Sequence, residues 1–592
     1  MKRSYISFEH GLYLLAFIVA LGVRLLRLGF APLSDFEAQW ALQALQVASG
    51  EGATIGPQPG YILLCGLVFF ILGSSDFLAR LWPAIAGSLL VWLPWFFRSR
   101  LGQKAALILA FGLALDPGLV ALSRLAGGPM FALGFGLLAL ASTLALGLIE
   151  ARQPVWAGIF GGLALLGGPA VWHGAAGLGL AYGLWRLLSR QRGRNNVQET
   201  EASPPRARTV HPGVLAAAGV ILLIGTLFGV YPQGLSAWVG TLPAYLQGWT
   251  VGGGKPASRL LAALVLYQPL ALVFGLKGAV EGWMRGALLP RVVSVLGLSA
   301  FVLAMIYPAR GAGDLVWVLV PLWVLAALEL AQHLKVQTEE RLPAFGQAAL
   351  ILVLLALAWM NFSALSRFAP GSEDNRLRWA VIFGALLLGG VTTVLVALGW
   401  SKRAAGRGLV WGVGAALGLY GLSAMVGATL LRPNGVGELW YPSPATTIQE
   451  SKLLLRTLDD LAVWRTGQRK TLDVVVLSPS PALRWALRDW HTVRFVSDLQ
   501  AVGAPEVIIT PADRTELKMA MAYRGQDFAW REAPGWGGGL PPAWEGWLAF
   551  REAPLQKEGL ILWARSDLFP GQELTVIEPA APMEEEPAVP GQ

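Results

Sequence analysis

Long apolar runs recur between residues 11 and 431 of this 592-residue chain, and they constrain its fold more than any other feature. A run of about 20 apolar residues is long enough to cross a bilayer as a helix, in which every backbone polar group is satisfied within the segment. The composition agrees, because only 14% of the residues are charged and 55% are hydrophobic. The sequence therefore predicts a polytopic α-helical membrane protein.

The apolar runs also predict a topology. They cover 11–28, 61–72, 81–97, 105–122, 130–149, 155–166, 170–188, 214–231, 260–280, 292–307, 315–331, 345–362, 379–400 and 409–431. The run 61–72 is too short for an upright span, so we expect about 13 transmembrane helices. With that count, Lys and Arg gather in the loops of one side, which places the N-terminus in the cytoplasm and the C-terminal part outside. Gly167-Gly-Pro169 predicts a tight turn between two of the runs.

Charge and cysteine content exclude several classes of protein. The net charge is +9, and the basic residues lie in short loops between apolar segments. Basic residues in such loops orient membrane helices, so they do not indicate nucleic-acid binding. Cys65 is alone, so an intramolecular disulfide and a cysteine-based metal site are excluded. The histidines are scattered without metal-ligand spacing. We expect no cofactor, and no divalent metal is indicated.

The character of the chain changes after residue 432. We predict a transmembrane domain at 1–432, with a first outer loop at 29–80, an inner linker at 189–212 and an outer loop at 232–258. Short apolar runs at 473–477, 506–510 and 559–564 alternate with helical patterns, which predicts a small extracytoplasmic α/β domain at 433–578. The Pro- and Glu-rich stretch 579–592 is predicted to be disordered. Tryptophans in this part either stack on sugar rings or pack a core, and they are Trp530, Trp536, Trp544 and Trp547.

The loop after the first apolar run carries the best clue to chemistry. Asp35 and Glu37 lie there, at the start of a segment with the pattern of an interfacial helix. Ser34 and Glu37 have capping-box spacing, so Glu37 is either a helix cap or a functional acid. Asp35 is a candidate general base that would activate an acceptor hydroxyl. Residues two apart on a helix point in different directions, so the two acids need not act as a pair.

Several stretches resemble a known family in their order along the chain. The loop sequence Asp35-Phe-Glu37 is similar to the first-loop acidic motif of the GT-C superfamily, and more narrowly to family 39 glycosyltransferases, the protein-mannosyltransferase-like enzymes. The supporting stretches are Pro57-Gln-Pro-Gly-Tyr61, Ser75-Asp-Phe-Leu-Ala-Arg-Leu-Trp-Pro-Ala84, Ala114-Leu-Asp-Pro-Gly-Leu-Val-Ala-Leu-Ser-Arg124, Tyr523-Arg-Gly-Gln-Asp-Phe528 and Trp563-Ala-Arg-Ser-Asp-Leu-Phe569. This sequence departs from the pattern in two places. Phe36 separates two acids that family members commonly place side by side, and Leu-Ala-Gly-Gly-Pro129 follows Arg124 where some relatives carry another acid.

The resemblance implies an inverting transfer of sugar from a polyprenyl-phosphate donor to an acceptor at the outer face of the plasma membrane. The acceptor would be a protein, a lipid or a cell-envelope glycan. Asp35, with Glu37 in the same motif, would supply the base. Arg124, Lys255 and Arg259 would meet the lipid phosphate, where positive charge stabilises the leaving group. The Gly252-Gly-Gly254 run before Lys255 suits an anion, or is merely a flexible loop.

Three further positions are candidates for the substrate cavity, each with a plainer alternative. Asp116 lies within an apolar run, where a carboxylate is functional by default, or it caps a helix broken at Pro117. His173 stands beside Trp172 and either lines a cavity or packs. Arg310 lines the cavity or pairs with Asp314. The alternative to an enzyme is a non-catalytic relative that assists translocation of lipid-linked sugars or envelope assembly. A transporter is disfavoured, because no inverted repeat of broken helices is apparent.

Overall fold

The chain divides into two compact units in a computed structural model. The structure describes residues 8–52, 54–127, 129–145, 153–192, 212–334, 338–369, 371–499, 502–514, 519 and 521–569. A helical unit comprises 1–31, 36–443 and 534–555, and a sheet unit comprises 32–35, 444–533 and 556–592. The predicted boundary at 432 differs from this division. The predicted disordered tail, and residues 193–211 of the predicted inner linker, lie outside the described residues.

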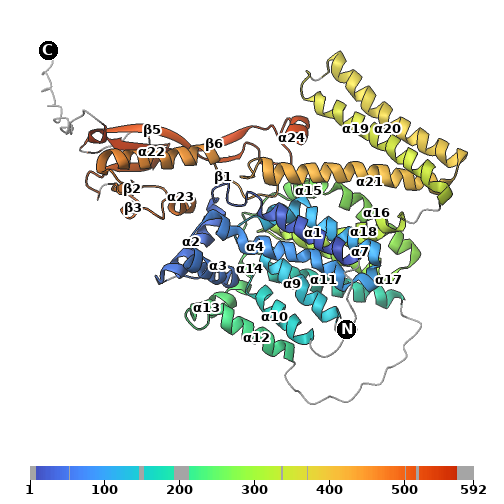
Figure 1. The fold of residues 1–592 in the computed structure, drawn as a ribbon, viewed down its shortest axis with the longest axis horizontal. Helices are drawn as coiled ribbons and strands as arrows, with labels where there is room; N and C mark the ends of the chain where they lie inside the picture. The colour runs from blue at the N-terminus through green and yellow to red at the C-terminus, as the bar shows by residue number, and fades with distance from the viewer. Residues whose placement is uncertain are drawn as a thin grey trace, which may run out of the picture. The chain divides into compact units, whose positions relative to one another are not determined.

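The helical unit holds most of the helices labelled in Figure 1. In chain order the helices up to residue 285 are α1 (Phe8–Leu25), α2 (Asp35–Ser49), α3 (Pro59–Leu72), α4 (Asp76–Leu89), α5 (Leu93–Phe96), α6 (Arg98–Leu101), α7 (Gln103–Leu115), α8 (Pro117–Ser123), α9 (Pro129–Ala145), α10 (Gln153–Leu165), α11 (Ala170–Arg192), α12 (Pro212–Gly225), α13 (Gln233–Val239), α14 (Thr241–Gln247), α15 (Ala257–Tyr267) and α16 (Pro269–Arg285). They are followed by α17 (Leu288–Ile306), α18 (Val316–Gln332), α19 (Arg341–Leu365), α20 (Glu373–Gly399), α21 (Lys402–Val426) and α24 (Trp544–Phe550).

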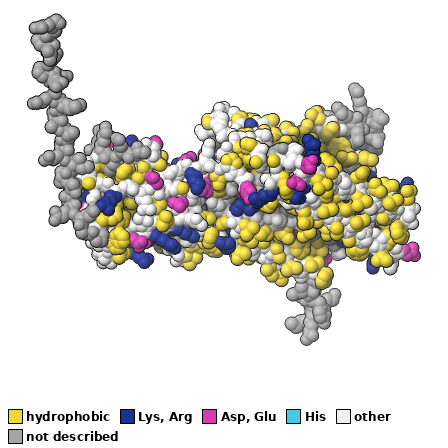
Figure 2. All heavy atoms as spheres, turned by 90° about the horizontal axis from the view of Figure 1, so that it is seen from above, with side chains coloured by type: hydrophobic (Ala, Val, Ile, Leu, Met, Phe, Trp, Pro, Cys, Tyr) yellow, Lys and Arg dark blue, Asp and Glu magenta, His cyan; other side chains and the backbone are white. Residues whose placement is uncertain are grey.

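The helices confirm a polytopic membrane protein, although not the predicted count. Within the described residues, 7 helices are long and apolar enough to cross a membrane, or up to 10 if each bent pair is one span. The number of about 13 is not confirmed, because α3, α9 and α12 are shorter apolar helices. On the face shown in Figure 2, hydrophobic side chains cover most of the helical unit, as expected of a surface that lipid covers.

Prolines break two of the apolar runs, 105–122 and 260–280, and a third proline lies in the turn between the runs 155–166 and 170–188. The pair α7 and α8 bends by 51°, the pair α10 and α11 by 118°, and the pair α15 and α16 by 92°. The prediction of one continuous span at 260–280 is therefore wrong. Pro269 has no N–H for the helical ladder and restricts the backbone of Gln268, so a new helix begins there. The predicted turn at 167–169 is confirmed, and Gly168 adopts a φ of +104° that favours glycine.

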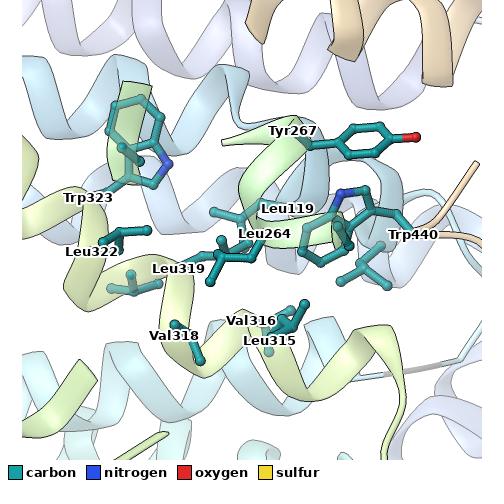
Figure 3. Packing of buried hydrophobic residues seen from close by; sticks show 14 of the residues in the cluster. Leu119, Leu264, Tyr267, Leu315, Val316, Val318, Leu319, Leu322, Trp323 and Trp440 are labelled. Atoms are coloured by element: carbon teal, nitrogen blue, oxygen red, sulfur yellow. The ribbon is translucent and has the colours of Figure 1, made fainter. Parts of the chain in front are cut away.

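A core of large side chains fills the centre of the helical unit (Figure 3). Tyr267 and Trp440 meet edge to face at 6.4 Å, and Trp323 lies in the same cluster. Glycines make room for these rings, since a Cβ on Gly118 would fall 2.7 Å from the Trp440 ring. Close packing of this kind fixes α8, α15 and α18 against one another.

The sheet unit confirms the predicted α/β character of the C-terminal part. Its strands are β1 (Ala445–Thr446), β2 (Val474–Val476), β3 (Val493–Phe495), β4 (Val507–Pro511), β5 (Tyr523–Pro534) and β6 (Leu555–Arg565), in the order β1-β5-β6-β4-β2-β3. Parallel β2 and β4 are buried, which explains their unbroken apolar runs. Two helices, α22 (Ile448–Thr466) and α23 (Pro481–Ala486), complete the unit.

Candidate functional site

Glu37 is the buried half of an ion pair in the helical unit. Arg80, on α4, donates from Nε and Nη2 to the two carboxylate oxygens of Glu37 at 2.6 and 2.8 Å. The Ala126 amide donates to the same carboxylate at 3.0 Å, and Arg80 also donates to the carbonyls of Leu28 and Ala31. The Glu37 side chain is 3% exposed. This bidentate geometry ties α2 to α4 and leaves an acceptor substrate little access to Glu37.

Asp35 belongs to the sheet unit and has three partners of its own. Its Oδ1 accepts hydrogen bonds from Ser480 Oγ at 2.6 Å and from the Ala482 amide at 2.9 Å, at the start of α23. Its Oδ2 accepts from Arg531, which also pairs with Glu558 at 2.8 Å. Both carboxylate oxygens therefore have hydrogen-bond donors within the sheet unit. The Asp35 side chain is 21% exposed, so it is the more accessible of the two acids.

Lys255 is held in a closely packed loop of the helical unit. Its amide donates to the Arg310 carbonyl at 2.9 Å, the Arg310 Nε donates back at 3.0 Å, and its Nζ donates to the Tyr441 carbonyl at 2.9 Å. A Cβ on Gly254 would fall 2.4 Å from the Pro308 carbonyl, so the glycine permits close approach of two backbones. Burial, with a smaller contribution from Arg259, lowers the pKa of the Lys255 ammonium to about 8.

Arg259 is a buried cation without a counterion among the residues that the structure describes. It lies in the first turn of α15 and is 7% exposed. Within the same described residues, its Nε and Nη2 have no hydrogen-bond partner. Burying a guanidinium without a partner costs several kcal/mol, so such a group is typical of a site that an anion completes. Arg259 also acts electrostatically on Lys255, so the structure brings together two of the predicted phosphate residues.

Sequence reasoning missed a buried carboxylate in the helical unit. Glu438 is 1% exposed and accepts hydrogen bonds from the Tyr267 hydroxyl and, at 2.7 Å, from Arg432 Nε. Arg551 Nε lies 3.5 Å from the same carboxylate, with its guanidinium 4.7 Å from the centre of the Tyr267 ring. Tyr267 is 171 positions from Glu438 in the chain, and Glu438 stands in a stretch that resembles a linker, so no local pattern reveals the cluster.

The other polar candidates in the broken spans have structural roles. Arg124 donates at 2.8 to 3.0 Å to three carbonyls at the end of α1, and thereby caps that helix. Asp116 accepts from the Leu119 amide at 2.8 Å and from Trp323 Nε1 at 2.8 Å. The cap at the break before Pro117 is thus present, as the plainer alternative for Asp116 expects.

His173 lies in an aromatic cluster. It is 1% exposed, with Nδ1 3.7 Å from Asp314 Oδ1, and the Tyr307 ring meets it edge to face at 5.5 Å. Arg310 donates to the carbonyls of Met305 and Tyr307. His173 and Arg310 are therefore both linked to the Tyr307 region.

The predicted tryptophan cluster is divided between the two units. Trp530 is buried in the sheet unit, where its Nε1 donates to Ser480 Oγ at 3.3 Å. Trp547 is buried in the helical unit and donates to the Gly437 carbonyl at 3.1 Å. Trp536 meets Trp547 edge to face, and Trp544 contacts Phe362 of α19. These contacts favour core packing.

Comparisons with known proteins give a likeness in structure. No family model matches the chain, and no curated protein matches it in sequence. The crystal structure of ArnT from Cupriavidus metallidurans bound to undecaprenyl phosphate is similar, with a TM-score of 0.55 and 17% identity, over 87% of this chain and 96% of ArnT. The chain has an ArnT-like GT-C fold. The apo form of the same protein gives a TM-score of 0.53 and 16% identity, over 89% of this chain and 98% of ArnT.

The GT-C fold confirms the predicted fold class, and membership of family 39 stays a prediction. The likeness spans both units of the chain, as the coverage of 87% requires. Among the described residues, no group of three or more His, Cys, Asp or Glu is placed to hold a metal ion.

Proposed function

We propose that this protein is a membrane glycosyltransferase that transfers a sugar from a polyprenyl-phosphate donor to an acceptor at the extracytoplasmic face. The observation that carries the proposal is the buried guanidinium of Arg259, unpaired within the described part of the chain and beside Lys255, in a protein with the GT-C fold. ArnT binds undecaprenyl phosphate in its crystal structure, which supports a lipid phosphate as the anion here. The acceptor class, inversion at the sugar and a cytoplasmic N-terminus belong to the same proposal.

The chemistry needs positive charge for the leaving group and a base for the acceptor. An acceptor oxygen bonds to the anomeric carbon while the bond from that carbon to the phosphate oxygen breaks. The lipid phosphate leaves with the bonding electrons, and Arg259 and Lys255 stabilise its growing charge. Asp35 is the proposed base for the acceptor proton, because it is the more accessible acid.

Replacing Arg259 by glutamine tests this proposal directly. Hydrogen bonds to charged groups contribute about 1.5–3 kcal/mol, so affinity for a polyprenyl-phosphate sugar should fall about 10- to 100-fold. The melting temperature of the ligand-free variant should equal or exceed that of the wild-type protein, because the substitution removes a buried charge that has no partner among the described residues. Transfer from a radiolabelled donor to membrane acceptors, with donor binding measured separately, checks both expectations. Unchanged donor binding in Arg259→Gln would overturn the phosphate site.

The pKa of Lys255 predicts how binding of polyprenyl phosphate depends on pH. Its pKa of about 8 means that the free protein loses this positive charge as the pH rises through 8. Affinity for polyprenyl phosphate should then fall by up to about tenfold per pH unit, since the phosphate completes its ionisation near pH 6. The unliganded fold should gain stability over the same range, because the unfolded chain binds the extra proton. In Lys255→Arg the charge persists, and a titration from about pH 7 to 9.5 should be flat.

A second candidate function is a non-catalytic relative that assists translocation of lipid-linked sugars or envelope assembly. The observation that favours it is the full pairing of Glu37 with Arg80 and the three donors on Asp35. Such a protein would bind the lipid phosphate through Arg259 without releasing sugar from it. Binding of labelled donor without transfer or hydrolysis by the purified protein, across several classes of acceptor, would select this function.

A further inference from the structure

The helical unit contains an apolar cavity of about 910 Å³ that the proposed reaction does not use. Three candidate membrane spans, α19, α20 and α21, supply much of its lining, with contributions from α15 and α24. The volume is within the range of sites that enclose a small ligand. Because the walls belong to candidate spans, a molecule dissolved in the membrane can reach the cavity, and the walls fit an aliphatic chain.

One end of the cavity carries positive charge. Arg432 and Arg551 both line it, and between them lies the carboxylate of Glu438. Among the described residues at this end, two guanidinium groups face one carboxylate, which leaves a net positive charge. The ion pair that Arg367 forms with Glu552 is neutral as a whole and does not change this balance. Charge complementarity therefore favours an anionic head group at this end.

The backbone is shaped to place Arg432 at the cavity. The last turn of α21 widens into a π-helix over Gly427–Leu431, an irregularity that is frequent at functional sites. The Arg432 amide donates to the Gly427 carbonyl at 2.9 Å, and a Cβ on Gly427 would fall 2.5 Å from Arg432 Nη2. Glycine at 427 thus lets the guanidinium fold back toward Glu438.

We propose that this cavity binds a membrane lipid with an anionic head group, whose chain lies between α19 and α21 and whose head group contacts Arg432 and Arg551. Its two guanidinium groups, Arg432 and Arg551, are not the cations that we assign to the donor phosphate. It does not depend on glycosyl transfer, because a non-catalytic relative would bind the same lipid.

Equilibrium binding of oleyl phosphate and oleyl alcohol to the full-length protein in detergent tests the proposal. The two probes share one chain and differ in the anionic head group. In Arg259→Gln, which lacks the proposed donor-phosphate cation, we expect one oleyl phosphate per chain, bound about tenfold more tightly than the alcohol, since charge-assisted hydrogen bonds are the strong ones. Adding Arg432→Gln should remove most of that difference. Equal affinity for the two probes in Arg259→Gln would overturn the assignment of the head group.

A pair of variants on α19 separates this cavity from other lipid contacts. Ala356 lines the cavity, so Ala356→Trp should fill it and lower oleyl phosphate affinity by about tenfold or more. Val353 on the same helix is 63% exposed and does not line the cavity, so Val353→Trp is the matched control and should bind normally. Arg259→Gln should keep the oleyl phosphate that Ala356→Trp removes, and should lose only binding at the proposed donor-phosphate site. Loss of binding in Arg259→Gln, with normal binding in Ala356→Trp, would overturn the proposal and place the lipid at the donor phosphate site.

Discussion

Replacing Glu37 by alanine is expected to lower the free energy of unfolding of the helical unit by about 3–5 kcal/mol. The substitution leaves the Arg80 guanidinium buried, with a side chain only 6% exposed and without the carboxylate that accepts two of its hydrogen bonds. The Ala126 amide loses its acceptor as well. Thermal unfolding of the purified protein in detergent, followed by intrinsic fluorescence, measures the loss as a lower melting temperature.

A double variant is the control for this expectation. Glu37→Leu combined with Arg80→Met removes both charges and keeps apolar volume, so it should recover much of the lost stability. Recovery would show that the cost of Glu37→Ala comes from the uncompensated cation rather than from the missing side-chain volume. An unchanged melting temperature in Glu37→Ala would contradict the burial and pairing of this carboxylate.

The apolar runs predicted the fold class well, because a helix in lipid must satisfy its own backbone and therefore needs an uninterrupted stretch. They failed where a proline breaks a run without lowering its hydropathy. Pro269 is the clearest case, since 260–280 has the pattern of one span and folds as two helices at 92°. The sheet was predicted in part. Buried β2 and β4 are plain apolar runs, whereas β5 has a largely polar sequence with few buried residues and was not predicted as a strand.

The candidate site was less predictable, because its meaning depends on partners distant in the chain. Asp35 and Glu37 are two positions apart, yet Ser480 is 445 positions from Asp35 and Arg80 is 43 positions from Glu37. The sequence indicated that both acids matter without indicating that both are paired. Lys255 and Arg259 are close in sequence and could be grouped from it. Only the structure shows that Nε and Nη2 of Arg259 lack a partner among the described residues. This lack makes Arg259 a candidate anion site.

Asp35→Asn is expected to lower sugar transfer by about 10²–10⁴-fold, the usual contribution of a positioned general base. The asparagine carbonyl can still accept from Ser480 Oγ and the Ala482 amide, so the start of α23 keeps its contacts. Donor binding should therefore change little while transfer falls, and the melting temperature should fall only slightly, because the ion pair with Arg531 that is lost is partly exposed. Initial rates with saturating labelled donor measure the effect. Transfer at the wild-type rate would exclude Asp35 as the base.

Arg531→Gln distinguishes a base from an anchor. Arg531 donates to Asp35 Oδ2, and Arg531→Gln removes this ion pair while Asp35 keeps its carboxylate and its hydrogen bonds from Ser480 and Ala482. If Asp35 accepts the acceptor proton, Arg531→Gln keeps most of the transfer activity, while Asp35→Asn is inactive. If Asp35 only fastens residues 32–35 to the sheet unit, both variants weaken the same ion pair and lower transfer and melting temperature together. The proposed mechanism requires the first pattern, since only a residue that takes part in the reaction makes the loss of its own carboxylate worse than the loss of its partner.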